Sequence, residues 1–262
     1  MSRPDPPAVL VGRNPVREAL ERADARIEKV LLRTGVHGSA IDAIRRAARA
    51  AGVPVQVVPE QRLRQLAPEA NHQGVVAVVA PVAYLGLDAM LSAVAPSLDA
   101  VRAARPLLVA LDEIADPHNF GAILRSAVAA GAAGAVVPDR NMAPLSATAV
   151  KASAGTAMRL PIARVGNLAE ALHQCKERGY WVVGLAGDAP ETDGPAQTTV
   201  WAYDWNRPVV LVVGSEGRGL RPRVRGVCDA LAAIPMRGPA ESLNASVAAG
   251  IALFAAVRER AD

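Results

Sequence analysis

Five short apolar segments constrain the fold of the second half of the chain more than any other feature. They lie at 107–111, 135–137, 180–185, 208–213 and 231–235. Each is apolar almost throughout rather than alternating, which is typical of strands buried on both faces of a mostly parallel sheet. Helical segments accompany them near 121–130, 145–153, 168–178, 222–228 and 247–257. We therefore predict a doubly wound α/β domain over residues 107–262.

The first part of the chain predicts a smaller α/β domain over residues 1–80. Strands are expected at 27–32, 54–58 and 75–80, one helix starting at Asn14-Pro15, and another capped by Ser39 and ending at Gly52. About 80 residues suffice for a small independent domain. Residues 81–106 carry prolines at both ends and Pro96 within, so we predict a linker there.

The composition is typical of a globular protein and bears on where in the cell the protein is expected. Hydrophobic residues make up 51% of the 262 residues, but no apolar run approaches the roughly 20 residues of a membrane-spanning helix. The polar, proline-rich Met1–Pro7 segment does not resemble a signal sequence, so we expect a cytoplasmic protein. Cys175 and Cys228 have no nearby histidine partners and are predicted to be buried thiols, and we expect no bound metal.

The basic residues favour a polyanionic partner. The formal net charge is +4, and only three of the 29 basic residues are lysine. Arginine suits phosphate because its planar fork donates two parallel hydrogen bonds, which makes RNA a plausible partner. Five arginines flank two polar loops: Arg218, Arg221, Arg223, Arg225 and Arg237. A GC-rich genome that favours arginine codons is an alternative that composition leaves open.

Three strand-to-helix corners carry the polar residues that are the best candidates for a functional site. The first, LLVALDEIADPHNFGAILRSAVAAG at 107–131, contains Asn119 and Arg125. The second, VVLVVGSEGRGL at 209–220, contains Glu216. The third, at 231–258, contains Ser242 and Asn244, either of which can cap the following helix. An ordinary helix cap explains the third corner alone, and Asn119 is open to the same interpretation. Asp112 and Glu113 are expected to be solvated loop charges.

Together the three corners resemble, in order, the three sequence motifs of the SpoU (TrmH) family of RNA ribose 2′-O-methyltransferases, within the SPOUT class. VGRNPVREAL at 11–20, NHQGVVAVV at 71–79 and the run 217–236 are similar to the subgroup that methylates a guanosine in large-subunit rRNA. This resemblance implies S-adenosylmethionine as cofactor and, as substrate, a guanosine in the peptidyl-transferase loop of 23S rRNA. It also implies an L30e-like N-terminal domain that holds RNA, a C-terminal trefoil knot and a homodimer.

The resemblance also assigns site residues. Gly214, Ile234, Leu243 and Met236 match positions near the methyl donor, while the polar site residues are Asn119, Arg125, Glu216, Ser242 and Asn244. Arg125 is the principal catalytic candidate, and because arginine stays protonated we expect it to position and activate the ribose rather than to act as a base. Glu216 is expected to form a structural ion pair with an arginine.

Two other functions stay open. Within the family, the chain could be a tRNA guanosine or a thiostrepton-resistance-type rRNA 2′-O-methyltransferase. Outside enzymology, it could be a non-catalytic RNA-binding ribosome-assembly factor that retains the fold.

Overall fold

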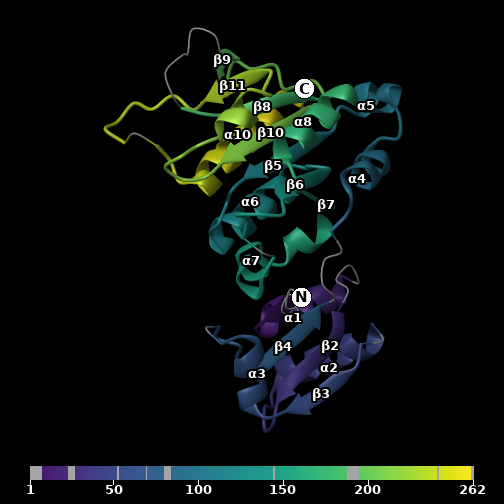
Figure 1. Cartoon of the computed structure of the whole chain (residues 1–262). Coiled ribbons are helices and arrows are strands. Elements are labelled where there is room, and N and C mark those ends of the chain that lie inside the picture. Colours follow the sequence, from purple (N-terminus) through teal and green to yellow (C-terminus); the bar gives the residue numbers. More distant parts are fainter. Residues whose placement is uncertain are drawn as a thin grey trace. The chain divides into compact units, whose positions relative to one another are not determined.

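The computed structural model describes residues 8–22, 27–51, 53–68, 70–79, 84–143, 145–187, 195–240 and 242–260. The chain divides into two compact units (Figure 1). Unit 1 comprises Met1–Val82 and Pro144–Arg159, and unit 2 comprises Ala83–Ala143 and Leu160–Asp262. Each unit contains its own sheet.

Unit 1 is built on a four-stranded sheet with the order β1-β4-β2-β3. Its strands are β1 (Ala8–Val11), β2 (Ile27–Arg33), β3 (Val55–Val58) and β4 (Val75–Val79). β4 lies antiparallel to both β1 and β2, and β3 is parallel to β2. Three of these strands match predicted segments; β1, which directly follows the proline-rich start, was not predicted.

The helices of unit 1 are α1 (Arg13–Glu21), α2 (Ser39–Ala50) and α3 (Glu60–Leu66). α1 and α2 bury Leu20 and Ile44 in one apolar cluster, and α3 buries Leu63 in a second. The expected caps were wrong. Gly12 and Gly38 occupy the N-cap positions, with φ of 100° and 120° that favour glycine, so Asn14 and Ser39 lie inside their helices. The predicted stop at Gly52 falls outside the described residues.

A segment from the middle of the chain completes unit 1. Helix α7 (Ala147–Ala152) and the 3-10 helix η1 (Thr156–Arg159) pack with the N-terminal strands and helices. Val150 is fully buried in the same cluster as Leu10 and Val16. The sequence pattern instead predicts the helix at 145–153 as part of the second domain. Helical periodicity indicates that Val150 is buried, but it cannot identify the residues that pack against Val150. Leu10 and Val16 lie more than a hundred residues away in the sequence.

Unit 2 contains a seven-stranded sheet with the order β7-β6-β5-β10-β8-β11-β9, in which every pairing is parallel. The strands are β5 (Leu107–Asp112), β6 (Gly134–Pro138), β7 (Ile162–Val165), β8 (Trp181–Leu185), β9 (Ala196–Thr199), β10 (Val209–Gly214) and β11 (Ala230–Ala233). The predicted α/β fold with a mostly parallel sheet is confirmed. β7 and β9 were not predicted.

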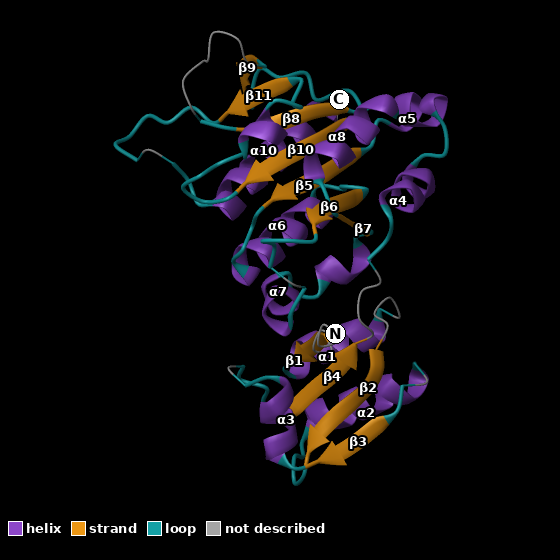
Figure 2. Ribbon diagram, in the orientation of Figure 1, coloured by secondary structure: helices purple, strands orange, loops and turns teal. Residues whose placement is uncertain are grey.

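Helices cover both faces of this sheet (Figure 2). One face packs against α4 (Leu87–Val94), α5 (Leu98–Ala104), α8 (Leu168–Glu177) and α9 (Pro222–Arg225). Alternate strand residues such as Val109 and Leu211 point to the other face and are fully buried. There α10 (Ala245–Arg260) contacts β10 and packs against α6 (Pro117–Ala129).

The predicted linker at 81–106 contains two helices instead. Met90 and Leu91 of α4 and Val101 of α5 are buried in the core of unit 2 together with Leu108. Prolines at the borders do not prevent short helices between them, and the apolar side chains of those helices become buried once the sheet is present. Residues 80–83 lie outside the described part of the chain. Among the described helices, none combines the length and hydropathy needed to cross a bilayer.

Both cysteines are buried free thiols, as predicted. Burial raises the pKa of Cys175 and of Cys228 to about 12, so both thiols stay protonated near neutral pH. We expect a chromogenic thiol reagent at pH 8 to react with neither cysteine in the native protein and with both after unfolding in guanidinium. Rapid stoichiometric labelling of the native protein would contradict this burial.

Candidate functional site

Asn119 lies near the start of α6, at the third position of the helix. Asp116 is the N-cap, since its carboxylate accepts a hydrogen bond from His118 N, and Pro117 follows in the first turn. The capping role considered for Asn119 therefore belongs to Asp116. Asn119 is only 8% exposed, and its Nδ2 donates to Glu216 Oε1 at 3.0 Å. Its amide thus serves a contact with a distant segment.

Glu216 lies in the loop that follows β10. This loop is closed by two backbone hydrogen bonds between Ser215 and Gly219. A Cβ atom on Gly214 would come within 2.3 Å of the carbonyl carbon of Gly219, so the turn requires glycine at 214. The tight closure directs Glu216 toward α6 and α10, where its carboxylate accepts several hydrogen bonds.

Asn244 joins the third segment to the other two. Its Oδ1 accepts hydrogen bonds from Ser246 N at 3.0 Å and Val247 N at 3.3 Å, so it caps α10. Its Nδ2 donates to Asn119 Oδ1 at 3.0 Å and to Glu216 Oε1. Ala245 N, the first amide of α10, also donates to Glu216 Oε1 at 3.3 Å. We call Asn119, Glu216 and Asn244 the amide–carboxylate cluster.

Arg125 and Ser242 do not join this cluster in the single chain. Arg125 is exposed on α6, six residues after Asn119, which places it about 240° around the helix. Ser242 is also exposed, and Asn244 rather than Ser242 caps α10. The predicted ion pair between Glu216 and an arginine is wrong for the described residues, because the partners of Glu216 are two side-chain amides and a backbone amide.

The residues expected near the methyl donor follow the carboxyl ends of two strands. Gly214 ends β10, and Ile234 and Met236 follow β11; Leu243 precedes α10. Ile234 and Leu243 are half-buried and Met236 is 39% exposed, so apolar surface is available at this edge. Open α/β sheets bind ligands at the carboxyl ends of their strands.

Comparison with known proteins decides the family. Residues 106–254 match the SpoU rRNA Methylase family, and residues 9–85 match the RNA 2′-O ribose methyltransferase substrate binding family. The chain belongs to the SpoU rRNA methylase family. The resemblance drawn from the three strand-to-helix corners is thereby confirmed.

Relatives of this SpoU-family protein cover nearly its whole length. The putative TrmH family tRNA/rRNA methyltransferase YacO of Bacillus subtilis is 40% identical over 96% of this chain and 95% of its own. The AdoMet-bound rRNA methyltransferase of Sinorhizobium meliloti has a TM-score of 0.74 at 29% identity, over 97% of this chain and 87% of its own. The SpoU methyltransferase AviRb of Streptomyces viridochromogenes, in complex with AdoMet, has a TM-score of 0.72 at 27% identity, over 97% of this chain and 90% of its own.

A second carboxylate that holds the loop after β10 was not predicted from the sequence. Asp112 is fully buried; it accepts hydrogen bonds from Arg221 N at 2.8 Å and from Arg221 Nε at 2.7 Å. Glu113 has a φ of 60°. Its Oε1 lies 3.3 Å from Arg221 Nη1 and accepts a hydrogen bond from Asn141 Nδ2 at 2.9 Å. The expectation of solvated loop charges was wrong. Asp112 is the last residue of a fully buried strand, and that position was the available signal.

The cluster predicts a stability effect that a purely solvated carboxylate would not have. Replacing Glu216 by Ala leaves the amide of Asn119 and the first amide of α10 without their acceptor, so we expect a loss of about 1–3 kcal/mol in the free energy of unfolding. Chemical denaturation measures this loss. Glu177→Ala, which removes an exposed carboxylate from α8, is the matched control and should change it by less than about 0.5 kcal/mol. Equal effects of the two substitutions would contradict the structural role of the cluster.

Proposed function

We propose that this SpoU-family protein is an S-adenosylmethionine-dependent RNA ribose 2′-O-methyltransferase, acting on a guanosine in the peptidyl-transferase loop of 23S rRNA. The convergence of three distant motif segments on the amide–carboxylate cluster carries the proposal. Support for RNA as substrate comes from the substrate-binding match over residues 9–85 and from the S. meliloti relative, which is described as an AdoMet-bound rRNA methyltransferase. A cytoplasmic location is part of this proposal.

The residues at the carboxyl edge of the sheet fit the methyl donor. When bound, S-adenosylmethionine supplies a methyl group attached to a positively charged sulfonium. Methyl transfer removes that charge, so an apolar environment such as Ile234, Met236 and Leu243 provide does not oppose the reaction. Gly214 lets the backbone of the 214–219 loop turn without a side chain at the site.

Arg125 is proposed to hold the RNA rather than to take a proton. Its guanidinium is permanently charged and exposed on α6, and can therefore bind the phosphate next to the target ribose and aim the 2′-hydroxyl. The nearby positive charge also stabilises the oxygen as its proton is lost. Asn119, Glu216 and Asn244 are proposed to position α6 relative to α10, and the hydroxyl of Ser242 to contact the ribose. Glu216 Oε1 already accepts three hydrogen bonds, which argues against a role as the base.

A homodimer is part of the proposal, and the surface of α10 supports it. Val247, Ile251 and Phe254 recur at spacings of four and three residues and so share one face of the helix. Val247 and Phe254 are 49% and 50% exposed, which is a large apolar exposure for one helix. α10 packs against α6, which carries Arg125. Burial of this face between two copies would bring Arg125 close to the subunit interface.

Methyl transfer from labelled S-adenosylmethionine to 23S rRNA tests the activity, and Arg125→Ala tests the mechanism. We expect the variant to lose at least about 100-fold in transfer rate, because charge stabilisation of this kind contributes about 10²–10³. Affinity for the donor, measured by calorimetry, should be unchanged. Arg102→Ala removes an exposed arginine from α5 and is the matched control.

An Arg125→Ala variant with full activity would remove that residue from the mechanism. Binding of rRNA by the unaltered protein without any methyl transfer would instead favour a non-catalytic assembly factor. Mapping the modified nucleotide separates 23S rRNA from tRNA as the target.

The proposed dimer makes a separate prediction. Phe254→Glu places a charge on the exposed face of α10 and should convert a dimer into a monomer in sedimentation velocity. Leu98→Glu alters a comparably exposed leucine at the start of α5, 42% exposed, and should leave the dimer intact. An unaltered protein that sediments as a monomer at micromolar concentration would contradict the dimer.

A further inference from the structure

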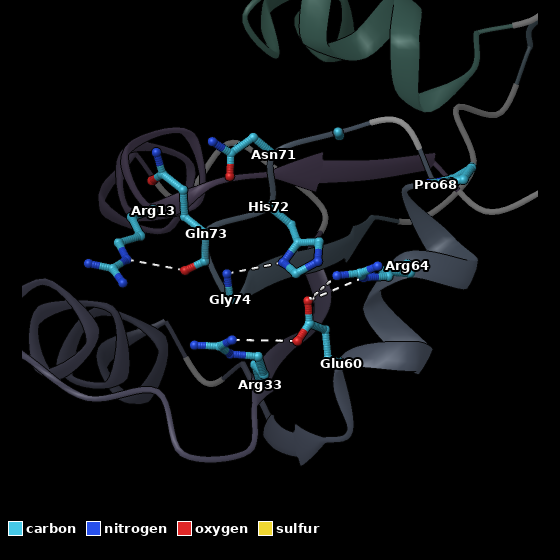
Figure 3. A pocket seen from close by; sticks show the side chains of 10 residues that line it. Arg13, Arg33, Glu60, Arg64, Pro68, Asn71, His72, Gln73 and Gly74 are labelled. Carbon is cyan, nitrogen blue, oxygen red and sulfur yellow. Dashed lines mark hydrogen bonds and ion pairs between the residues drawn. The ribbon is translucent and has the colours of Figure 1, made fainter.

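Unit 1 contains a polar pocket that the methyl-transfer chemistry does not use. Its volume is about 750 Å³, within the range of about 300–1,000 Å³ typical of sites for small ligands. Four segments contribute its walls: the start of α1, the end of β2, α3 and the loop before β4 (Figure 3). The lining side chains that bear on its chemistry are Arg13, Arg33, Glu60, Arg64, Asn71, His72 and Gln73.

Positive charge predominates in this pocket. Glu60 is shared by two arginines, with Oε1 2.8 Å from Arg64 Nη2 and Oε2 3.5 Å from Arg33 Nη1. The hydrogen bond from Arg64 lowers the pKa of Glu60, so the carboxylate stays ionised and orients both guanidiniums. Arg13 has no carboxylate partner among the described residues; its Nε donates to Gln73 O at 3.2 Å. Three guanidiniums and one carboxylate leave a net charge that attracts an anion.

The Arg13 guanidinium is held in place for such a contact. Its Nε–H is used by the backbone of the facing loop, so the side chain is anchored at one nitrogen (Figure 3). Neither terminal nitrogen pairs with a carboxylate among the described residues, so both can donate to an anion. This arrangement suits a phosphate, which accepts two parallel hydrogen bonds from one guanidinium.

The loop before β4 holds three consecutive polar side chains at the pocket. Val75 N donates to His72 O at 2.8 Å, closing a turn whose central residues Gln73 and Gly74 have φ of 48° and 79°. Gly74 suits this conformation, but the left-handed region is unfavourable for Gln73 and marks a strained position. Gly74 N also donates to His72 Nδ1 at 3.1 Å, which fixes the imidazole ring. The turn therefore displays Asn71, His72 and Gln73 in defined positions.

We propose that this pocket binds one unstacked nucleotide of the substrate RNA, with its phosphate on Arg13 and its base against Asn71, His72 and Gln73. Side-chain amides pair with base edges, and an imidazole ring stacks on an unpaired base. A free phosphate could accept hydrogen bonds from these side chains, but only a nucleotide would also offer them a base edge and an aromatic face. The pocket thus deepens the proposed function, on which it rests for RNA as the ligand.

The inference also explains two sequence segments that the catalytic chemistry leaves unused. VGRNPVREAL at 11–20 and NHQGVVAVV at 71–79 lie outside unit 2, yet both resemble the rRNA-methylating subgroup. Arg13 belongs to the first, and His72 and Gln73 belong to the second. The hydrogen bond from Arg13 to Gln73 O joins them at the wall of the pocket.

Binding of a fluorescent single-stranded RNA corresponding to the peptidyl-transferase loop tests the pocket. We expect Arg13→Gln to weaken binding about tenfold and to lower the slope of log affinity against log salt by about 1, as loss of a phosphate contact does. Gln73→Ala, which removes an exposed side chain and relieves no core packing, should weaken binding at unchanged salt slope. Arg45→Gln neutralises an exposed arginine of α2 outside the pocket and is the matched control, with an expected change of less than about twofold.

Equal losses in Arg13→Gln and Arg45→Gln would show a general basic surface and overturn the pocket. Unchanged affinity in both Arg13→Gln and Gln73→Ala would overturn it as well. Inorganic phosphate provides the second arm: amide NMR shifts of residues 71–75 that saturate equally with phosphate and with RNA would reduce the pocket to an anion site. RNA binding that depends on the pocket, without methyl transfer, would refute the proposed activity and leave this inference standing. Methyl transfer with no dependence on the pocket would do the reverse.

Discussion

The hydrogen bonds of the Glu216 carboxylate link three segments of unit 2 that are far apart in the sequence. Its Oε1 accepts hydrogen bonds from the amide side chains of Asn119 and Asn244 and from the first amide of α10. A negative charge at the start of two helices is favoured by their dipoles, and it satisfies N–H groups that helix starts leave without partners. One side chain therefore links Asn119, which lies 97 residues before it in the sequence, with Asn244, which lies 28 residues after it.

A second carboxylate supports the same loop from the neighbouring strand. β5 and β10 pair in register, with Asp112 opposite Gly214. Buried Asp112 binds the backbone and the guanidinium of Arg221, at the end of the loop that begins at Gly214. The glycine-containing loop is thus held at its middle by Glu216 and at its end by Asp112. Arg221 is accordingly a structural residue, while Arg218, Arg223 and Arg237 are exposed.

In unit 1 a carboxylate also holds several polar side chains in place. Glu60 holds two arginines in orientation, and the backbone of a strained turn holds a third. In unit 2 the contacts of Glu216 and Asp112 are made within the protein and organise the backbone. In unit 1 the polar contacts leave positive charge and amide groups facing a cavity, which is the arrangement expected where the partner is a polyanion. In the proposed function, unit 2 positions the reacting groups and unit 1 holds the RNA.

The sequence by itself determined the parallel sheet and the three motif corners, because buried strands are apolar throughout and Asn119, Glu216 and Asn244 follow the strands at their carboxyl ends. Only the tertiary structure decided which partners these residues take, that Asp112 is buried, and that Val150 packs into unit 1. It also decided that residues 87–104 form two helices and that Arg125 lies apart from the amide–carboxylate cluster. Local propensity and periodicity depend on neighbours a few residues away. Hydrogen bonds and packing between distant segments are set by the register of the sheet, which no short stretch of sequence specifies.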